Sequence, residues 1–159
     1  MSSFRDIVAN PLKLRLFLVT KLPSAYFAGV RVRYFDGERA NVSVPYKWFS
    51  TNPFRSTYFA CLAMAAEMST GLLAMNAIFG RKPAVSMLVV KMEAEYFKKA
   101  ISHTFFECTD GHEIAQAVEL ACSSGESTQF TATATGKNTA GETVAVFHFT
   151  WSFKQKTQT

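Results

Sequence analysis

Glu67 is the residue in this 159-residue sequence whose setting is most suited to chemistry. It is the only charged residue between Arg55 and Arg81, and it lies in the middle of a long apolar stretch. A carboxylate held away from water has a raised pKa, so it can act as a general base near neutral pH or as a nucleophile. Hydrolysis of an acyl group needs such a residue together with donors for the developing oxyanion. The alternative for Glu67 is a buried acid whose carboxylate hydrogen-bonds polar side chains across a subunit interface.

Other polar groups near Glu67 in the sequence are weaker candidates. Asn52 can position a substrate carbonyl or a water, although an Asn before a Pro more commonly forms a turn. The backbone of residues 58–60 falls at a predicted helix start, where free N–H groups can stabilise an oxyanion. Ser69 and Thr70 can hold water or substrate, but hydroxyls in mid-helix more often bond back to the preceding turn.

The histidines and cysteines do not predict a metal site or a nucleophile. His103, His112 and His148 are too dispersed for a ligand set or a triad to be inferred, and we expect them at the surface. The cysteines are odd in number and widely spaced, at Cys61, Cys108 and Cys122. Neither a disulfide framework nor a zinc site is indicated. The sequence therefore predicts no metal.

The stretch from Ser56 to Gly80 must position Glu67. It is rich in Ala, Leu and Met, which favours a helix, and its apolar residues cover every face, which is typical of a helix surrounded by protein or lipid. A bilayer-spanning helix is the rival interpretation. An acid at mid-span costs roughly 2.5–3.5 kcal/mol, and the chain has no second such stretch. We therefore predict a central helix in a soluble domain, with no stable membrane insertion.

The flanking segments predict a sheet around this helix. Residues 30–34 and 40–46 alternate as a hairpin, and residues 84–97, 101–108, 129–135 and 147–153 predict further strands. An amphipathic helix introduced by a capping box of Asp110 and Glu113 is inserted between two of these strands. Near the N-terminus, residues 3–22 predict a short helical turn and then a helix beginning near Pro11. The predicted fold class is α+β, with a curved antiparallel sheet around a long helix.

Composition and charge bound the remaining functions. The length fits a single domain, 1–159, with an N-terminal helical segment (1–27), a core (28–153) and a polar tail (154–159). The net charge of +5 comes from scattered Lys and Arg residues, so we expect no nucleic-acid partner. Charged residues interrupt the first apolar residues before a signal peptide develops, which predicts a cytoplasmic protein.

The order and spacing of these residues resemble the hotdog-fold thioesterases, most closely the phenylacetyl-CoA-thioesterase-like branch and its uncharacterised relatives. Asn52 matches the family's loop Asn, Glu67 matches its mid-helix acid, and the strand ending near Tyr96 follows as expected. Phe59 and Ala60 stand where the family has two glycines, and Tyr58 replaces its His. The resemblance implies a hotdog fold and a substrate site at these positions.

What the resemblance implies for function is hydrolysis of an acyl-CoA or acyl-carrier thioester by a homodimer or a dimer of dimers. Glu67 would be the base or nucleophile, the Phe59 and Ala60 amides the oxyanion donors, and CoA part of the substrate, with no other cofactor. Two alternatives stay open: a non-catalytic binder of acyl or lipid-like ligands, and a structural oligomer. The missing glycines favour the binder and the retained acid favours the enzyme.

Overall fold

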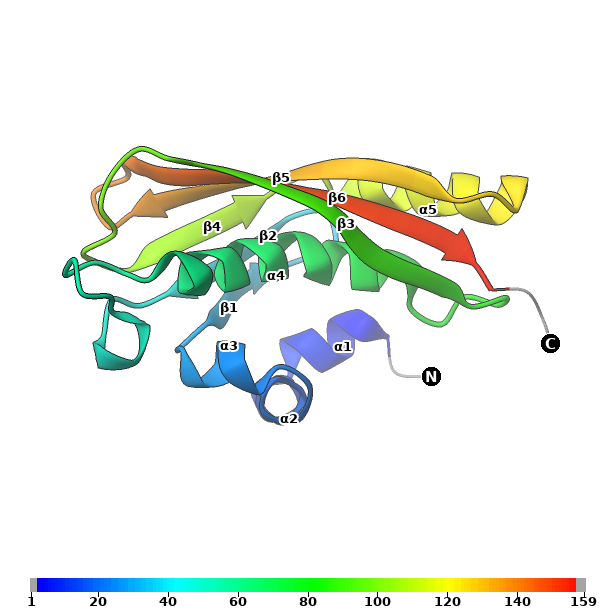
Figure 1. Cartoon of the computed structure of the whole chain (residues 1–159). Helices are drawn as coiled ribbons and strands as arrows, with labels where there is room; N and C mark the ends of the chain where they lie inside the picture. Colours follow the sequence, from blue (N-terminus) through cyan, green and yellow to red (C-terminus); the bar gives the residue numbers. More distant parts are fainter. Residues whose placement is uncertain (1–2, 157–159) are drawn as a thin grey trace.

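A computed structural model of the chain describes residues 3–156 and shows a six-stranded antiparallel sheet curved around one long helix (Figure 1). The strand order is β1-β2-β4-β5-β6-β3, so β1 and β3 form the two edges. The strands are β1 (Arg31–Phe35), β2 (Ala40–Val44), β3 (Val85–Tyr96), β4 (Thr104–Cys108), β5 (Thr128–Asn138) and β6 (Thr143–Gln155). The helices are α1 (Phe4–Ala9), α2 (Pro11–Lys21), α3 (Pro23–Phe27), the 3₁₀ turn η1 (Trp48–Ser50), α4 (Phe59–Ile78) and α5 (Gly111–Ser124). The predicted fold class is confirmed.

The central helix α4 is the predicted helix, and it lies against the concave face of the sheet. Ala65, Ala66 and Ala74 have no exposed surface, because small side chains let the helix approach the strands closely. It is the one helix in residues 3–156 with the length and apolar composition to cross a membrane. However, 61% of its apolar stretch is buried within the domain. These features identify α4 as a core helix.

The sheet contributes the other half of the core. Alternate residues of β6 form an aromatic stripe, in which Phe147, Phe149, Trp151 and Phe153 are each at most 4% exposed. Across from them on β5, Ala132 and Ala134 are fully buried and leave room for the helices. Gly136 is required for the same reason, because a Cβ there would lie 2.4 Å from the Phe106 ring. The alternation of large and small residues along β5 and β6 thus creates the space that α4 fills.

Three short helices cover the side of α4 that the sheet leaves open (Figure 1). The helix starting at Pro11 is the predicted one, and the Asn10 side chain caps it by accepting from the Leu12 and Lys13 amides. The additional helix α3 begins at Pro23 and was not predicted. The inserted helix α5 packs against α4, β5 and β6, and it ends with the left-handed residue Gly125.

Several predicted details of the element boundaries were wrong. Asp110 does not cap α5 with its side chain, because its carboxylate accepts the Thr133 amide, which lies beyond the end of the β4–β5 pairing. The strand predicted from residue 101 begins at Thr104. At the C-terminus, β6 continues to Gln155, into the predicted tail, whose last residues 157–159 lie outside the described residues.

Candidate active site

Glu67 lies at a small apolar cavity between α2, α4 and β3. The cavity has a volume of about 170 Å³. Its lining comes from three segments that are distant in sequence: Phe17, Leu18, Lys21 and Leu22; Glu67, Met68, Gly71, Leu72 and Met75; and Met87. The N-terminal helix α2 therefore covers the carboxyl group from the side opposite the sheet.

The position of the Glu67 carboxylate depends on a glycine one turn further along α4. A Cβ built on Gly71 would lie 3.0 Å from Glu67 Oε1 and 3.5 Å from Trp151 Cζ2. A glycine inside a helix costs about 1 kcal/mol relative to alanine. Its presence in this otherwise favourable helix is explained by the close approach of the carboxylate. Gly71 thus makes room for the candidate catalytic group.

The electrostatic setting of Glu67 is that of a desolvated acid without a compensating partner. Burial raises the pKa of Glu67 above its ordinary value. Within residues 3–156 no group donates a hydrogen bond to the carboxylate, and no cation lies within ion-pair distance of it. Lys21 lines the same cavity but is itself exposed. A carboxylate of this kind is a stronger base than an exposed one and is suited to accept a proton.

The start of α4 is held in place by the loop that precedes it. The Thr57 amide and hydroxyl both donate to the Ala100 carbonyl oxygen, at 2.8 and 3.0 Å, and the Tyr58 amide donates to Ser50. Asn52 organises this loop, because its Oδ1 accepts from the Phe54 and Ser56 amides. Tyr58 is the N-cap of α4, and the hydroxyls of Ser56 and Thr57 are engaged in these loop contacts.

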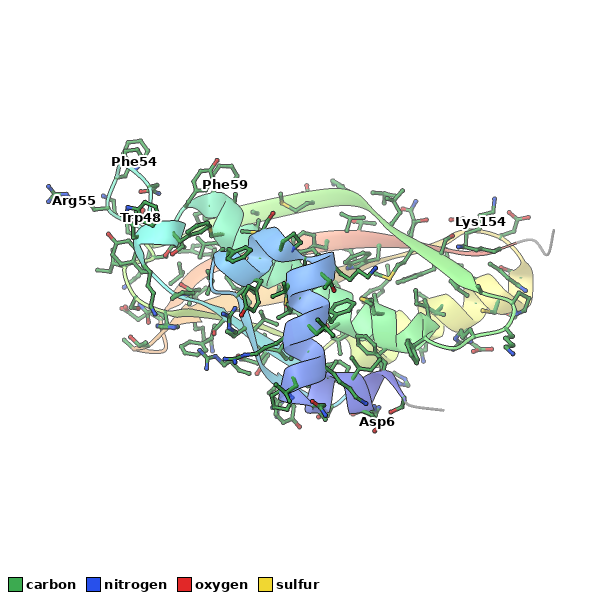
Figure 2. All side chains as sticks on the ribbon, turned by 90° about the horizontal axis from the view of Figure 1, so that it is seen from below. Asp6, Trp48, Phe54, Arg55, Phe59 and Lys154 are labelled. Atoms are coloured by element: carbon green, nitrogen blue, oxygen red, sulfur yellow. The ribbon has the colours of Figure 1, made fainter. Side chains whose placement is uncertain are left out.

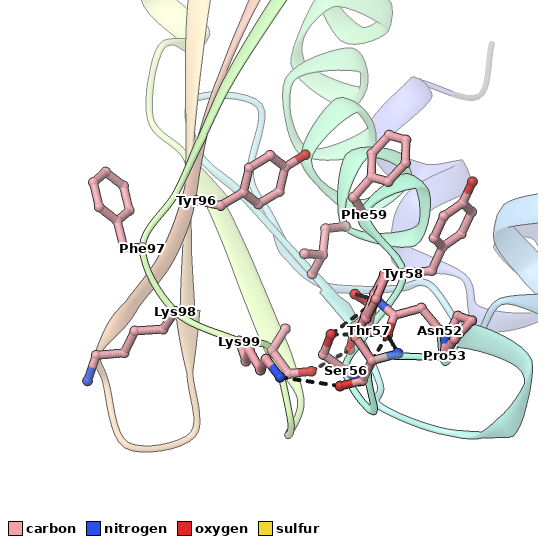
Figure 3. Close-up of a pocket in the computed structure, with 13 residues that line it drawn as sticks. Asn52, Pro53, Ser56, Thr57, Tyr58, Phe59, Tyr96, Phe97, Lys98 and Lys99 are labelled. Carbon is pink, nitrogen blue, oxygen red and sulfur yellow. Dashed lines mark hydrogen bonds between the residues drawn. The ribbon is translucent and has the colours of Figure 1, made fainter.

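A second, larger pocket of about 550 Å³ lies at this end of α4. Figure 3 shows Tyr96 of β3 pointing toward α4, with Phe59 beside it and Phe97 turned away. Phe59 and Ala60 are the first two residues of α4, so their N–H groups have no partner within the helix. Neither amide donates to any other acceptor in the described chain. The helix start therefore presents two free donors beside an apolar pocket.

The other candidates near Glu67 point away from both pockets. Ser69 and Thr70 are buried, and each hydroxyl donates back to the carbonyl three residues earlier, as the alternative interpretation predicted. Thr70 has a further structural role, because its Oγ1 accepts the Trp151 indole N–H at 3.0 Å. Thr70 therefore holds the helix against β6, and neither Ser69 nor Thr70 lines the Glu67 cavity.

Comparison with known proteins now places the chain in a family. The family model named DUF4442, a domain of unknown function, matches residues 14–153. The chain belongs to the DUF4442 family. No curated protein matches it significantly.

Solved structures share the fold of this DUF4442 protein. A protein of unknown function from Pseudomonas aeruginosa, PA5026, described as a probable thioesterase, is 19% identical with a TM-score of 0.79, over 92% of this chain and 97% of the other. The thioesterase HI1161 from Haemophilus influenzae is 10% identical with a TM-score of 0.67, covering 92% and 91%. A putative thioesterase from Shewanella oneidensis is 10% identical with a TM-score of 0.71, covering 89% and 94%. These similarities confirm the hotdog fold.

The structure of this DUF4442 protein brings together some predicted site residues and separates others. Asn52, Tyr58 and Phe59 line the larger pocket, whereas Glu67 lines the smaller one. Sequence reasoning missed Gly71, although a glycine four residues after the only acid of the helix was a usable signal. It also missed Leu18 and Met87, for which the sequence carried no signal. Among residues 3–156 no group of three or more His, Cys, Asp or Glu side chains could hold a metal ion.

Proposed function

We propose that this DUF4442 protein hydrolyses an acyl-CoA or a related acyl thioester, with Glu67 as general base or nucleophile. The observation that carries the proposal is the Glu67 carboxylate, which lies at an apolar cavity with a raised pKa and no partner. The hotdog fold shared with proteins described as thioesterases supports it. Activation of water or direct attack on the thioester carbonyl needs no metal and no cofactor beyond the CoA or carrier of the substrate. The cytoplasmic location stays a prediction from the sequence.

The free amides of Phe59 and Ala60 are the proposed donors for the oxyanion. A donor must lie about 2.7–3.1 Å from the oxyanion, and the acid or base must be similarly close to the reacting atoms. Eight residues of α-helix separate Phe59 from Glu67, which is roughly 12 Å at 1.5 Å per residue. This separation favours a site whose two halves come from different chains. We therefore propose that the helix start of one chain and Glu67 of another act on the same thioester.

A homodimer formed through the edge strand β3 would join these halves. β3 pairs with β6 on one side only, and its concave-facing residues Met92 and Tyr96 stay partly exposed. The neighbouring side of α4 is half-exposed as well, at Phe59, Ala63, Met64 and Glu67. Antiparallel pairing of two β3 strands about a two-fold axis places the Met87 end of one beside the Tyr96 end of the other. The Glu67 cavity of one subunit would then face the helix start of its partner.

A non-catalytic binder of acyl or lipid-like ligands is the second candidate, and Phe59 favours it. Its ring packs on Tyr58 with centroids 4.9 Å apart and is 54% exposed at the mouth of the larger pocket. A ring at this position restricts the approach of a thioester carbonyl to the helix-start amides. A protein that bound acyl chains without hydrolysing them would tolerate such a ring.

Turnover of an acyl-CoA panel by the wild type and by Glu67→Gln tests the proposal. Loss of the thioester ultraviolet band is the suitable signal, since the protein has free cysteines of its own, among them the partly exposed Cys122, that interfere with thiol dyes. We expect Glu67→Gln to lose about 100-fold or more, the scale of removing an acid–base group. Glu126→Gln, an exposed glutamate in the turn after α5, is the matched control and should keep full activity. Binding of the panel without turnover by the wild type would instead establish the binder.

Mixed dimers test whether the site is shared between subunits. Phe59→Pro removes one helix-start amide at a position that accepts proline, because Tyr58 is already extended with ψ of 133°. Phe59→Ala keeps the amide and separates the effect of the ring. If each site combines Glu67 of one chain with the helix start of the other, mixing inactive Glu67→Gln and Phe59→Pro chains restores about one quarter of the wild-type activity, by random assortment in a two-fold dimer. No recovery after confirmed subunit exchange would refute the shared site.

A further inference from the structure

We propose that the face formed by α2, α3 and η1 binds the surface of membranes that contain anionic lipids. This face lies on the far side of α4 from the sheet, and Figure 2 views it directly. We call it the helical face and define it by its exposed apolar residues Leu12, Leu16, Val19, Phe27, Trp48 and Phe49. The inference is independent of the proposed thioesterase activity, because it rests on none of the Glu67 site.

The outer side of α2 carries an exposed apolar stripe next to basic residues. Leu12, Leu16 and Val19 recur at intervals of four and three residues, so they form one stripe, and Leu12 and Leu16 are 77% and 66% exposed. Lys13 and Arg15 flank the stripe, and α2 contains no acidic residue. The opposite side of the same helix, with Leu18, is the side that packs onto the domain. The outer stripe is therefore an additional apolar surface that folding of the chain leaves uncovered.

A line of aromatic rings extends this surface from α3 to η1. Tyr26 contacts Phe27, Phe27 lies 6.4 Å from Phe49, and Phe49 lies 5.9 Å from Trp48 between ring centroids. Trp48 is 87% exposed and protrudes at one end of the molecule (Figure 2). Aromatic rings with a polar edge gather at the headgroup level of membranes, where one part of the ring is apolar and the other is wet. Trp48 and its neighbours are suited to that position.

A basic pocket adjoins the aromatic line. It has a volume of about 370 Å³, and Phe27 and Phe49 form part of its wall. Its charged and titratable lining residues are Arg31, Arg33, Lys47 and His103, and none of its lining residues is acidic. Burial, together with the nearby charges of Arg33 and Lys47, lowers the pKa of His103. A lipid phosphate would find several donors there, directly beside rings that can enter the headgroup layer.

The distribution of charge along the chain matches an anionic surface. Residues 1–66, which supply the whole helical face, contain nine Lys and Arg residues but only three Asp and Glu residues. Residues 67–159 contain eight Lys and Arg residues and nine Asp and Glu residues. The net positive charge of the protein therefore resides in the part that forms this face. A second copy of the chain would oppose cations to cations here, and the β3 edge offers dimerisation a different surface. Charge complementarity thus selects an anionic lipid surface as the partner.

Vesicle binding, followed by flotation and by Trp fluorescence, tests this proposal on the intact protein. Trp48 and the 4% exposed Trp151 are the only tryptophans, so a blue shift on binding reports Trp48, with Trp48→Phe as the baseline. We expect the blue shift with vesicles that contain phosphatidylglycerol and little binding to vesicles of pure phosphatidylcholine. Salt at about 0.5 M should release the protein, because it screens surface charges strongly. Trp48→Ala and the pair Leu12→Ser with Leu16→Ser should each weaken partitioning by about tenfold or more.

Matched controls separate this face from non-specific attraction. Lys47→Ala should weaken partitioning about fivefold, whereas Lys154→Ala should have no effect, since Lys154 lies at the opposite end of the molecule (Figure 2). Leu120→Ser, an exposed leucine on α5, is the control for the apolar substitutions. The proposal is overturned if the wild type stays unbound to anionic vesicles, or if the control variants lose as much binding as the face variants. It is equally overturned if Trp48 shifts with protein concentration alone, which would identify a second copy as the occupant.

Discussion

Gly71→Ala should stabilise the protein while it impairs hydrolysis. Replacing a mid-helix glycine by alanine contributes about 1 kcal/mol to helix stability. In a domain of this size that corresponds to a rise in Tm of about 2–4 °C. The new methyl group would make ordinary contact with Trp151 at 3.5 Å but lie only 3.0 Å from Glu67 Oε1, so the carboxylate must move by a few tenths of an ångström. The stabilised protein should therefore have a displaced Glu67 carboxylate.

The activity of Gly71→Ala should fall by about 3–10-fold, because a displacement of about 1 Å in a catalytic site can cost on the order of 100-fold and the carboxylate here moves by only a few tenths of that distance. Thermal unfolding and acyl-CoA turnover are measured on the same preparations. Asn76→Ala, which also replaces a weak helix former within α4 but does not line the Glu67 cavity, is the matched control. Its Tm should rise similarly with full activity. A Gly71→Ala protein that is stabilised and fully active would show that the position of Glu67 does not matter for the reaction.

Three further changes test the stabilising contacts. Because burial raises the pKa of Glu67 in the folded state, that state binds more protons than the unfolded chain above about pH 4, and its stability falls as pH rises. In chemical denaturation, the free energy of unfolding of Glu67→Gln should therefore increase relative to that of the wild type as the pH rises. If the variant were equally favoured below about pH 4, this reasoning would be contradicted. Thr70→Val leaves the Trp151 indole N–H unpaired and should cost about 1–3 kcal/mol in thermal unfolding, which an unchanged Tm would refute. Asn52→Ala should lower the free energy of unfolding by about as much as Thr70→Val, because the Phe54 and Ser56 amides lose their acceptor. Asn52→Asp keeps an accepting oxygen and should lower it less.

The elements of this fold were predictable where local pattern and tertiary role agree. α4 was predicted because a helix buried on every side must be apolar on every side, and β6 because its aromatic residues alternate. Glu67 was identifiable for the related reason that a single acid in an apolar helix is costly and needs an explanation. The absence of any other charged residue around Glu67 identified it without any knowledge of the fold.

The contacts that the sequence did not reveal are those between distant segments. Asp110 has the sequence position of a helix cap. However, the β4–β5 pairing ends before Thr133, and the Thr133 amide donates its hydrogen bond to the Asp110 carboxylate. The Glu67 cavity likewise requires α2 and β3 to meet beside α4, which no local pattern specifies. His103 was expected at the surface, but it is partly buried at the wall of the basic pocket, whose three cations come from other segments.

The helix α2 connects the two proposals of membrane binding and catalysis. Its inner side, with Phe17, Leu18 and Lys21, covers the Glu67 cavity, and its outer side carries the Leu12 and Leu16 of the helical face. A helix that shifts toward a lipid surface would therefore uncover the carboxylate, because the same few turns serve both surfaces.

This coupling predicts that anionic vesicles raise the rate of hydrolysis of long-chain acyl-CoA by the wild type. The same vesicles should not change the rate for Leu12→Ser with Leu16→Ser, whose basal activity without vesicles should equal that of the wild type. Sequestration of the substrate by lipid would affect both proteins alike, so their difference reports α2. Equal stimulation of both proteins would show that membrane binding, where it occurs, leaves the cover over Glu67 in place.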